Sequence, residues 1–151
     1  MKKRRGEEAD VLFGEEMVTP KKVLVIDDYR DLLELLGEVL TVFGWDAILA
    51  DNAQEALSKL EDGLPSVILL DMRMAGMNGF EVAGILKKHP VYDKIPILAA
   101  SAYPGDLARA RSLAAGCDDF ISKPFAISAL QTRLTRLVSI ASQRASKVTR
   151  P

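Results

Sequence analysis

The sequence is short of the features that mark secreted and membrane proteins. Its 151 residues include one cysteine, Cys117, so no disulfide can form within the chain, as expected for an intracellular protein. No apolar run approaches the roughly 18–20 residues that a membrane helix needs. The basic start, Met1 to Arg5, lacks the apolar stretch that would follow it in a secretory signal. We therefore expect a cytoplasmic protein with no membrane partner.

Charge is unevenly spread over a composition that is otherwise ordinary for a globular protein. Hydrophobic residues make up 48% of the chain and charged residues 27%, which excludes a disordered or collagen-like chain. Residues 22–125 carry ten basic and sixteen acidic side chains, whereas residues 126–151 carry five basic and no acidic ones. The length suits one domain. The net charge of −1 thus hides an acidic centre and a basic end.

Three segments differ in periodicity. Residues 1–20 mix charge with Gly, Thr and Pro, and we interpret them as a disordered or linker-like leader. Residues 21–145 alternate short apolar runs with helical periodicity and form the predicted domain, and residues 146–151 form a predicted flexible basic tail. Strands are expected over residues 23–26, 45–50, 67–70, 95–100 and 118–122.

Helices are expected after each of these strands. Asn52 with Glu55, and Asn78 with Glu81, have the spacing of capping boxes at helix starts. Five strands alternating with five helices imply an α/β fold with a parallel sheet that is covered on both faces.

Polar residues stand where the predicted strands end. Asp27 and Asp28 follow the first strand, Asp71 the third, Ser101 the fourth and Lys123 the fifth. Because ligands bind at the carboxyl ends of parallel strands, we expect these five side chains to meet at one edge of the sheet.

The chemistry of this set points to phosphoryl transfer. Clustered carboxylates repel one another, and a hard cation such as Mg²⁺ relieves that repulsion while it binds phosphate oxygens. A lysine and a hydroxyl suit phosphoryl oxygens, and a carboxylate can itself be the nucleophile. The alternative is that the aspartates are helix caps or loop residues.

At this point the sequence resembles a known family. Val-Leu-Val-Ile-Asp27-Asp28, Ile-Leu-Leu-Asp71-Met-Arg-Met with Gly76 and Gly79, Ala-Ala-Ser101-Ala and Lys123-Pro124-Phe125 look like a CheY-like receiver domain of the two-component response regulators. The resemblance covers about residues 22–140. It implies a flavodoxin-like, doubly wound five-stranded parallel sheet with strand order 2-1-3-4-5 and five helices.

The resemblance also implies roles for individual residues. Asp71 would be the phosphoacceptor, taking a phosphoryl group from a phosphohistidine of a histidine kinase or a histidine phosphotransfer protein. Asp27, Asp28, Asp71 and the backbone carbonyl of Arg73 would hold Mg²⁺, with Mn²⁺ as an alternative ion. No organic cofactor is expected, and the protein would be no enzyme beyond catalysing its own phosphorylation and dephosphorylation.

Further residues would report the phosphorylated state. Lys123 would pair with phosphoryl oxygens, Ser101 would hydrogen-bond the phosphoryl group, and Phe120 would be the switch aromatic, where the family often has Tyr. The Lys123–Pro124 peptide is typically cis in this family. Ala126 stands where an Asp often caps the last helix, so the capping-box pair Ser128 and Gln131 predicts that this helix starts late.

Arg73 and Tyr103 carry a separate hypothesis. They lie two residues after Asp71 and Ser101, and by resemblance these positions flank the path of the water that attacks the acyl phosphate. Large side chains there would slow self-dephosphorylation. The alternative is that both are solvent-exposed surface residues.

The output surface implied by the resemblance is the fourth helix, fifth strand and fifth helix. Here it would include Arg109, Arg111, Phe120 and residues 131–136. The 28 residues after Lys123 are too few for an output domain, so we expect action by docking, as a monomer or a weak phosphorylation-dependent dimer. Nucleic acid is not an expected partner, because the terminal cations lack interleaved aromatics.

Three alternatives stay open. The chain could be a fragment of a hybrid kinase or of a multidomain regulator. It could be a pseudo-receiver that binds partners without phosphorylation. It could also bind nucleic acid through its basic end.

Overall fold

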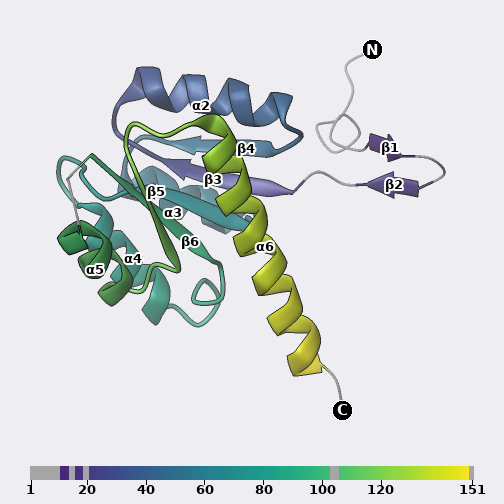
Figure 1. Ribbon diagram of the computed structural model, residues 1–151. Coiled ribbons are helices and arrows are strands. Elements are labelled where there is room, and N and C mark those ends of the chain that lie inside the picture. Colours follow the sequence, from purple (N-terminus) through teal and green to yellow (C-terminus); the bar gives the residue numbers. More distant parts are fainter. Residues whose placement is uncertain (1–10, 14–15, 19–20, 103–105, 150–151) are drawn as a thin grey trace.

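A five-stranded parallel sheet organises the chain in the computed structural model, which describes residues 11–13, 16–18, 21–102 and 106–149 (Figure 1). The strand order is β4-β3-β5-β6-β7. In chain order this is 2-1-3-4-5, which confirms the predicted topology. The strands are β3 (Lys22–Ile26), β4 (Asp46–Ala50), β5 (Val67–Asp71), β6 (Ile97–Ser101) and β7 (Asp119–Ser122).

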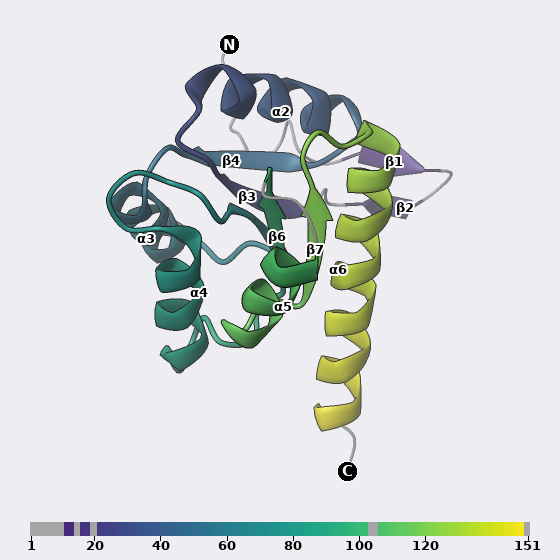
Figure 2. The same ribbon diagram turned by 60° about the vertical axis from the view of Figure 1, so that its left-hand side comes forward.

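Five helices cover the two faces of this sheet (Figure 2). They are α2 (Arg30–Val42), α3 (Ala53–Asp62), α4 (Gly79–Lys88), α5 (Asp106–Ala114) and α6 (Ile127–Thr149). Leucines of α2 and α6 pack on one face, and apolar residues of α3, α4 and α5 pack on the other. The domain is therefore a three-layer α/β sandwich, as predicted. No helix in the described part of the chain is long and apolar enough to span a membrane.

The central strand β5 shows why the sheet is parallel and covered on both sides. All five of its residues are buried. Ile68 and Leu70 belong to the core on one face, and Val67 and Leu69 to the core on the other. Since successive side chains point to opposite faces, a run of aliphatic residues suits a strand with helices on both sides.

The predicted helix caps are confirmed at two helices, and the prediction for a third helix is wrong. The Asn52 side chain accepts a hydrogen bond from the Glu55 N–H at 2.8 Å, and Asn78 forms a complete capping box with Glu81. α6 begins at Ile127, because the Ala126 carbonyl already accepts from the Leu130 N–H at 3.1 Å. The late start predicted from the Ser128 pair is wrong.

The two ends of the chain contain regular elements that are not among the predicted strands and helices. Within the segment predicted to be a disordered or linker-like leader, β1 (Val11–Phe13) pairs with antiparallel β2 (Glu16–Val18), which satisfies backbone groups in this apolar stretch. Within the predicted flexible tail, α6 continues to Thr149. Its last three turns contain neither Gly nor Pro, so nothing in the sequence stops the helix earlier.

Candidate functional site

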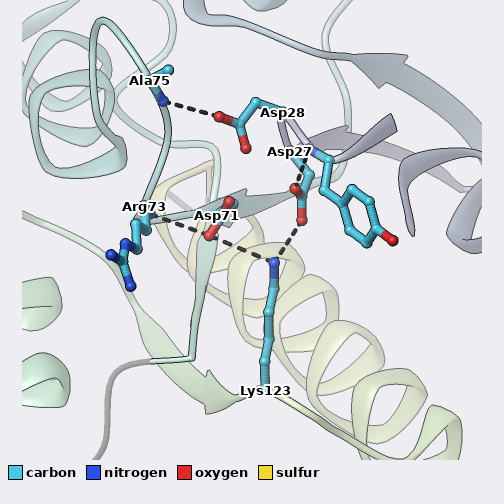
Figure 3. A network of polar contacts seen from close by, with 7 residues as sticks. Asp27, Asp28, Asp71, Arg73, Ala75 and Lys123 are labelled. Carbon is cyan, nitrogen blue, oxygen red and sulfur yellow. Dashed lines mark hydrogen bonds and ion pairs between the residues drawn. The ribbon is translucent and has the colours of Figure 1, made fainter. Parts of the chain in front are cut away.

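Four of the five predicted polar residues, Asp27, Asp28, Asp71 and Lys123, meet at the carboxyl edge of the sheet (Figure 3). Asp27 follows β3, Asp71 is the last residue of β5, Ser101 the last of β6, and Lys123 follows β7. Parallel pairing places these strand ends side by side, with Asp71 opposite Ala100 and Ser101 opposite Ser122. The sheet register therefore assembles residues that are up to 96 positions apart in the sequence.

Three carboxylates form the centre of the site. Each of Asp27, Asp28 and Asp71 offers an oxygen within 4.8 Å of the others. Asp27 is 3% exposed and Asp71 6% exposed, whereas Asp28 is exposed. The turns around the site orient them: the Tyr29 N–H donates to Asp27 Oδ1 at 2.9 Å, and the Ala75 N–H donates to Asp28 Oδ2 at 2.9 Å.

Lys123 provides the positive charge facing these carboxylates. Its Nζ lies 2.6 Å from Asp27 Oδ2 and 3.6 Å from Asp71 Oδ1. One ammonium thus faces two buried carboxylates, with the third nearby. Negative charge remains in excess, which is the condition that favours a bound cation.

The acidity of Asp71 reflects this environment. Burial raises the pKa of Asp71 from 3.8 to about 6, against the lowering effect of Lys123, and Asp27 raises the pKa further. The Arg73 N–H donates to Asp71 Oδ1 at 3.2 Å and favours the ionised form. At neutral pH the side chain is therefore an ionised but poorly solvated carboxylate.

Gly79 explains how α4 can begin so close to Asp71. A Cβ atom at this position would lie 2.5 Å from the Asp71 carbonyl oxygen and 2.5 Å from Met72 Cα. The Gly79 N–H donates to the Met72 carbonyl at 3.2 Å. The absence of a side chain lets the loop after β5 turn back against the strand end.

The donor set suits a hard divalent cation. Carboxylate oxygens from three residues are the ligands that Mg²⁺ and Mn²⁺ prefer, and no softer sulfur or imidazole ligand belongs to the cluster among the described residues. Asp27, Asp28 and Asp71 could hold such an ion. The participation of the Arg73 backbone carbonyl stays a prediction.

The other predicted site residues are placed as follows. Ser101 is buried at the end of β6, and Phe120 is buried within β7, so its ring points into the core. The Lys123–Pro124 peptide is cis, as predicted. The Arg73 side chain is exposed. Tyr103 lies outside the described residues.

Sequence reasoning missed contacts that come from the backbone and from distant segments. The Ala75 N–H that holds Asp28 belongs to a residue with no functional side chain. At the rim, Arg30 of α2 forms an ion pair with Asp51, which follows β4. Gly76 adopts a positive φ in the tight turn beside Ala75, and the glycine itself is the sequence signal that could have indicated this turn.

A doubly wound α/β domain that gathers three aspartates and a lysine at the carboxyl ends of its strands belongs to the receiver class of signalling domains. Residues 23–135 match the response regulator receiver domain. The chain belongs to the response regulator receiver domain family.

Individual relatives agree with this assignment. The chain is 33% identical over 114 residues to the phosphate regulon transcriptional regulatory protein PhoB of Pseudomonas aeruginosa, covering 76% of this chain and 50% of that protein. The chemotaxis protein CheY4 of Vibrio cholerae has a TM-score of 0.74 and 27% identity, covering 79% of this chain and 99% of CheY4.

A receiver domain of a larger protein is similar too. The signal receiver domain of a signal transduction histidine kinase from Syntrophus aciditrophicus has a TM-score of 0.72 and 29% identity, covering 79% of this chain and 90% of that one. The chain spans about half the length of the first curated relatives it matches. Receivers similar to this chain therefore occur as parts of longer proteins.

Proposed function

We propose that this protein is a phosphoacceptor in two-component or phosphorelay signalling, with Asp71 as the residue that is phosphorylated. The proposal rests on one observation: Lys123 Nζ lies 3.6 Å from Asp71 Oδ1 in a cluster of three carboxylates, two of which are buried. Its donor would be a phosphohistidine of a histidine kinase or a phosphotransfer protein in the cytoplasm, as the family membership implies.

The reaction needs few groups from this chain. A carboxylate oxygen of Asp71 attacks phosphorus, the new O–P bond forms, and the N–P bond of the phosphohistidine breaks with its electron pair left on the imidazole, which takes up a proton. Lys123 donates to the phosphoryl oxygens and disperses their charge. Ser101, at the end of the neighbouring strand, would hydrogen-bond the same group after a small movement.

Asp27, Asp28 and Asp71 would hold the cation, together with the Arg73 carbonyl. A bound Mg²⁺ or Mn²⁺ would neutralise the carboxylates and coordinate a phosphoryl oxygen. The chain's own contribution is to keep the acidic oxygens within 4.8 Å of one another while Lys123 approaches from β7. The protein would catalyse its own phosphorylation and dephosphorylation and no other reaction.

The proposed output surface is formed by α5, β7 and α6. α5 buries Ala108 and Ser112, and it exposes Leu107 and Leu113 together with Arg109. A helix with so narrow a buried stripe is held by few contacts and can shift when Phe120 or Ser101 moves. The exposed leucines then offer apolar contact area to a downstream protein.

The proposal is tested by phosphorylation with a small phosphodonor. We expect the full chain, incubated with Mg²⁺ and acetyl phosphate, to gain one phosphoryl group by intact mass, stable in acid and labile in base. Asp71→Asn should gain none, and chelating the cation should prevent uptake.

Asp62→Asn is the matched control, because Asp62 lies at the exposed end of α3 away from the site. It should be phosphorylated like the natural chain. A phosphoryl group that persists in Asp71→Asn, or a natural chain that stays unmodified while it binds Mg²⁺, would contradict the proposal and favour a pseudo-receiver.

A further inference from the structure

A groove lies at the amino edge of the sheet, at the other end of the strands from Asp71. It has a volume of about 520 Å³ and lies between α6 and the segments that lead into β6 and β7. Its lining residues are Lys87, Asp93, Lys94, Pro96, Asp118, Leu137, Ile140, Ala141, Arg144 and Ala145. None of them takes part in the site at the carboxyl edge.

One wall of the groove is formed by α6. Its apolar stripe continues beyond the part of the helix that packs on the core. Leu137, Ala141 and Ala145 recur at intervals of four and so share one face of the helix. Figures 1 and 2 show the C-terminal half of α6 projecting past the sheet and the other helices. Leu137 is buried, Ala141 is half-buried and Ala145 is exposed. The face that packs on the core thus continues beyond it, and its small residues allow close approach of another backbone.

The groove lining has three basic side chains, Lys87, Lys94 and Arg144, and two carboxylates, Asp93 and Asp118, so it carries an excess of one positive charge. Asp93 Oδ1 is buried and has no hydrogen-bond partner among the described residues. Lys87 Nζ lies 3.3 Å from Asp118 Oδ2, which also accepts from the Ile97 N–H at 2.8 Å, so the Asp118 carboxylate is satisfied. Lys94 and Arg144 are exposed, and neither has an ion-pair partner among the residues that the structure describes. The two cations therefore stand on opposite sides of the groove: Lys94 lies in the loop between α4 and β6, and Arg144 lies on α6.

We propose that this groove docks an acidic amphipathic helix of another protein, independently of phosphorylation at Asp71. Apolar side chains of that helix would lie on Leu137, Ile140 and Ala141, and its flanking carboxylates would pair with Lys94 and Arg144. This is recognition of a helix in a groove, with charge fixing orientation and partner choice.

A second copy of the chain fits the groove less well. Residues 126–149 include Arg133, Arg136 and Arg144 and no acidic residue. Two such helices side by side would bring like charges together, whereas an acidic helix complements them. The charge pattern of α6 therefore selects the occupant.

The test uses two synthetic helical peptides of about 18 residues. Both have leucines at positions i, i+4 and i+7; one has glutamates at the flanking positions and the other has lysines. We expect the acidic peptide to shift the backbone amide signals of Lys94, Ile140 and Arg144 in NMR spectra of the full chain. The basic peptide should bind at least about tenfold more weakly.

Variants separate this groove from other surfaces. Lys94→Glu combined with Arg144→Glu should weaken the acidic peptide by at least about tenfold and strengthen the basic one. Both side chains are exposed, so the fold should persist, which a thermal melt checks. Arg136→Glu, an exposed arginine of α6 outside the groove, and Asp71→Asn should both leave the affinity unchanged.

Three results with the peptides would overturn the proposal: no binding of the acidic peptide, equal binding of the two peptides, or amide shifts centred on α5 or on the Asp71 site. A fourth would be a dimer in sedimentation that dissociates in Ile140→Glu, because a second copy of the chain would then occupy the groove. The phosphorylation test gives its result regardless of this one, because the two experiments probe opposite edges of the sheet.

Discussion

The two edges of the sheet handle charge in opposite ways. At the carboxyl edge, the ammonium of Lys123 faces Asp27 and Asp71, and Asp28 adds a third carboxylate to the cluster. At the amino edge, Lys87 donates to the carbonyls of Asp93 and Ile95, each at 3.2 Å, and pairs with Asp118.

This difference in charge compensation shows which edge of the sheet is suited to binding and reaction. The Asp118 carboxylate is paired with both the Lys87 cation and the Ile97 N–H, so this cluster holds loops together. The Asp71 cluster lacks sufficient counter-charge, and its excess is the part that can bind a cation and accept a phosphoryl group. Four predictions probe this comparison, ordered from the largest expected effect to the smallest.

Removing the counter-charge at the carboxyl edge should have the largest effect. Lys123→Met deletes the donor that faces the phosphoryl oxygens, and the rate of phosphoryl uptake from acetyl phosphate should fall by about 10²–10³-fold. Lys123→Arg should not restore it, since a planar guanidinium cannot occupy the place of a compact ammonium.

Lys59→Met, an exposed lysine of α3, is the control and should be phosphorylated normally. The role assigned to Lys123 is wrong if Lys123→Met keeps the natural rate while the fold is intact.

Neutralising the acceptor should stabilise the cation-free protein in a pH-dependent way. The raised pKa of Asp71 means that the folded chain binds this proton more tightly than the unfolded chain. The resulting stabilisation is complete below pH 3.8 and is lost as the pH rises through about 6. Ionised Asp71 then costs at most about 3 kcal/mol at neutral pH, and Asp71→Asn should recover part of this.

Urea unfolding without Mg²⁺ measures the effect. At neutral pH, Asp71→Asn should have a higher free energy of unfolding than the natural chain. This difference should be smaller at about pH 4. It should also become smaller when Mg²⁺ is added, because the ion stabilises the natural chain. An advantage of equal size at both pH values would disagree with this account.

Breaking the cluster at the amino edge should reduce stability and leave the chemistry intact. Lys87→Met removes three hydrogen bonds and leaves Asp118 without its cation, at a cost of about 2 kcal/mol in the free energy of unfolding. Lys88→Met changes an exposed neighbour and should be close to neutral. Phosphoryl uptake at Asp71 should match the natural chain in both variants; a slower uptake in Lys87→Met would show that the two edges are coupled.

The smallest expected effect concerns the lifetime of the acyl phosphate. If the large side chains of Arg73 and Tyr103 hinder the attacking water, Arg73→Asn combined with Tyr103→Ala should lose the phosphoryl group several-fold faster, equivalent to about 1 kcal/mol in the barrier. Release of phosphate from the purified phosphoprotein measures this. An unchanged lifetime would refute the hypothesis.

Much of the fold could be predicted because its signals are local. Val67 to Leu70 is apolar throughout, as a strand covered on both faces requires, and Asn78 with Glu81 marks a helix start. The extents of the terminal elements could not be read in the same way. Nothing local separates the part of α6 that packs on the core from the part that runs past it, and Gln131, which resembled a capping residue, accepts a hydrogen bond from Trp45 Nε1 at 2.6 Å.

In the candidate site, too, features marked by local sequence patterns could be predicted, and contacts between distant segments could not. Asp27, Asp71, Ser101 and Lys123 could be named from the sequence, because each follows or ends a strand and parallel strands end at a common edge. The N–H of Ala75 on Asp28 and the contact of Arg111 with the Phe80 ring, 4.5 Å from its centroid, could not, because they join segments with no shared pattern.

The sequence by itself determined which residues could carry the chemistry and which strands would present them, since both follow from residue type and from periodicity along the chain. Only the tertiary structure decided how much charge each cluster would keep. Three carboxylates within 4.8 Å of one another and one ammonium 2.6 Å from Asp27 are distances between strands, set by sheet register and helix packing. The same packing projects α6 past the sheet and opens the groove beside Lys94 and Arg144, because no local signal ends that helix at the edge of the core.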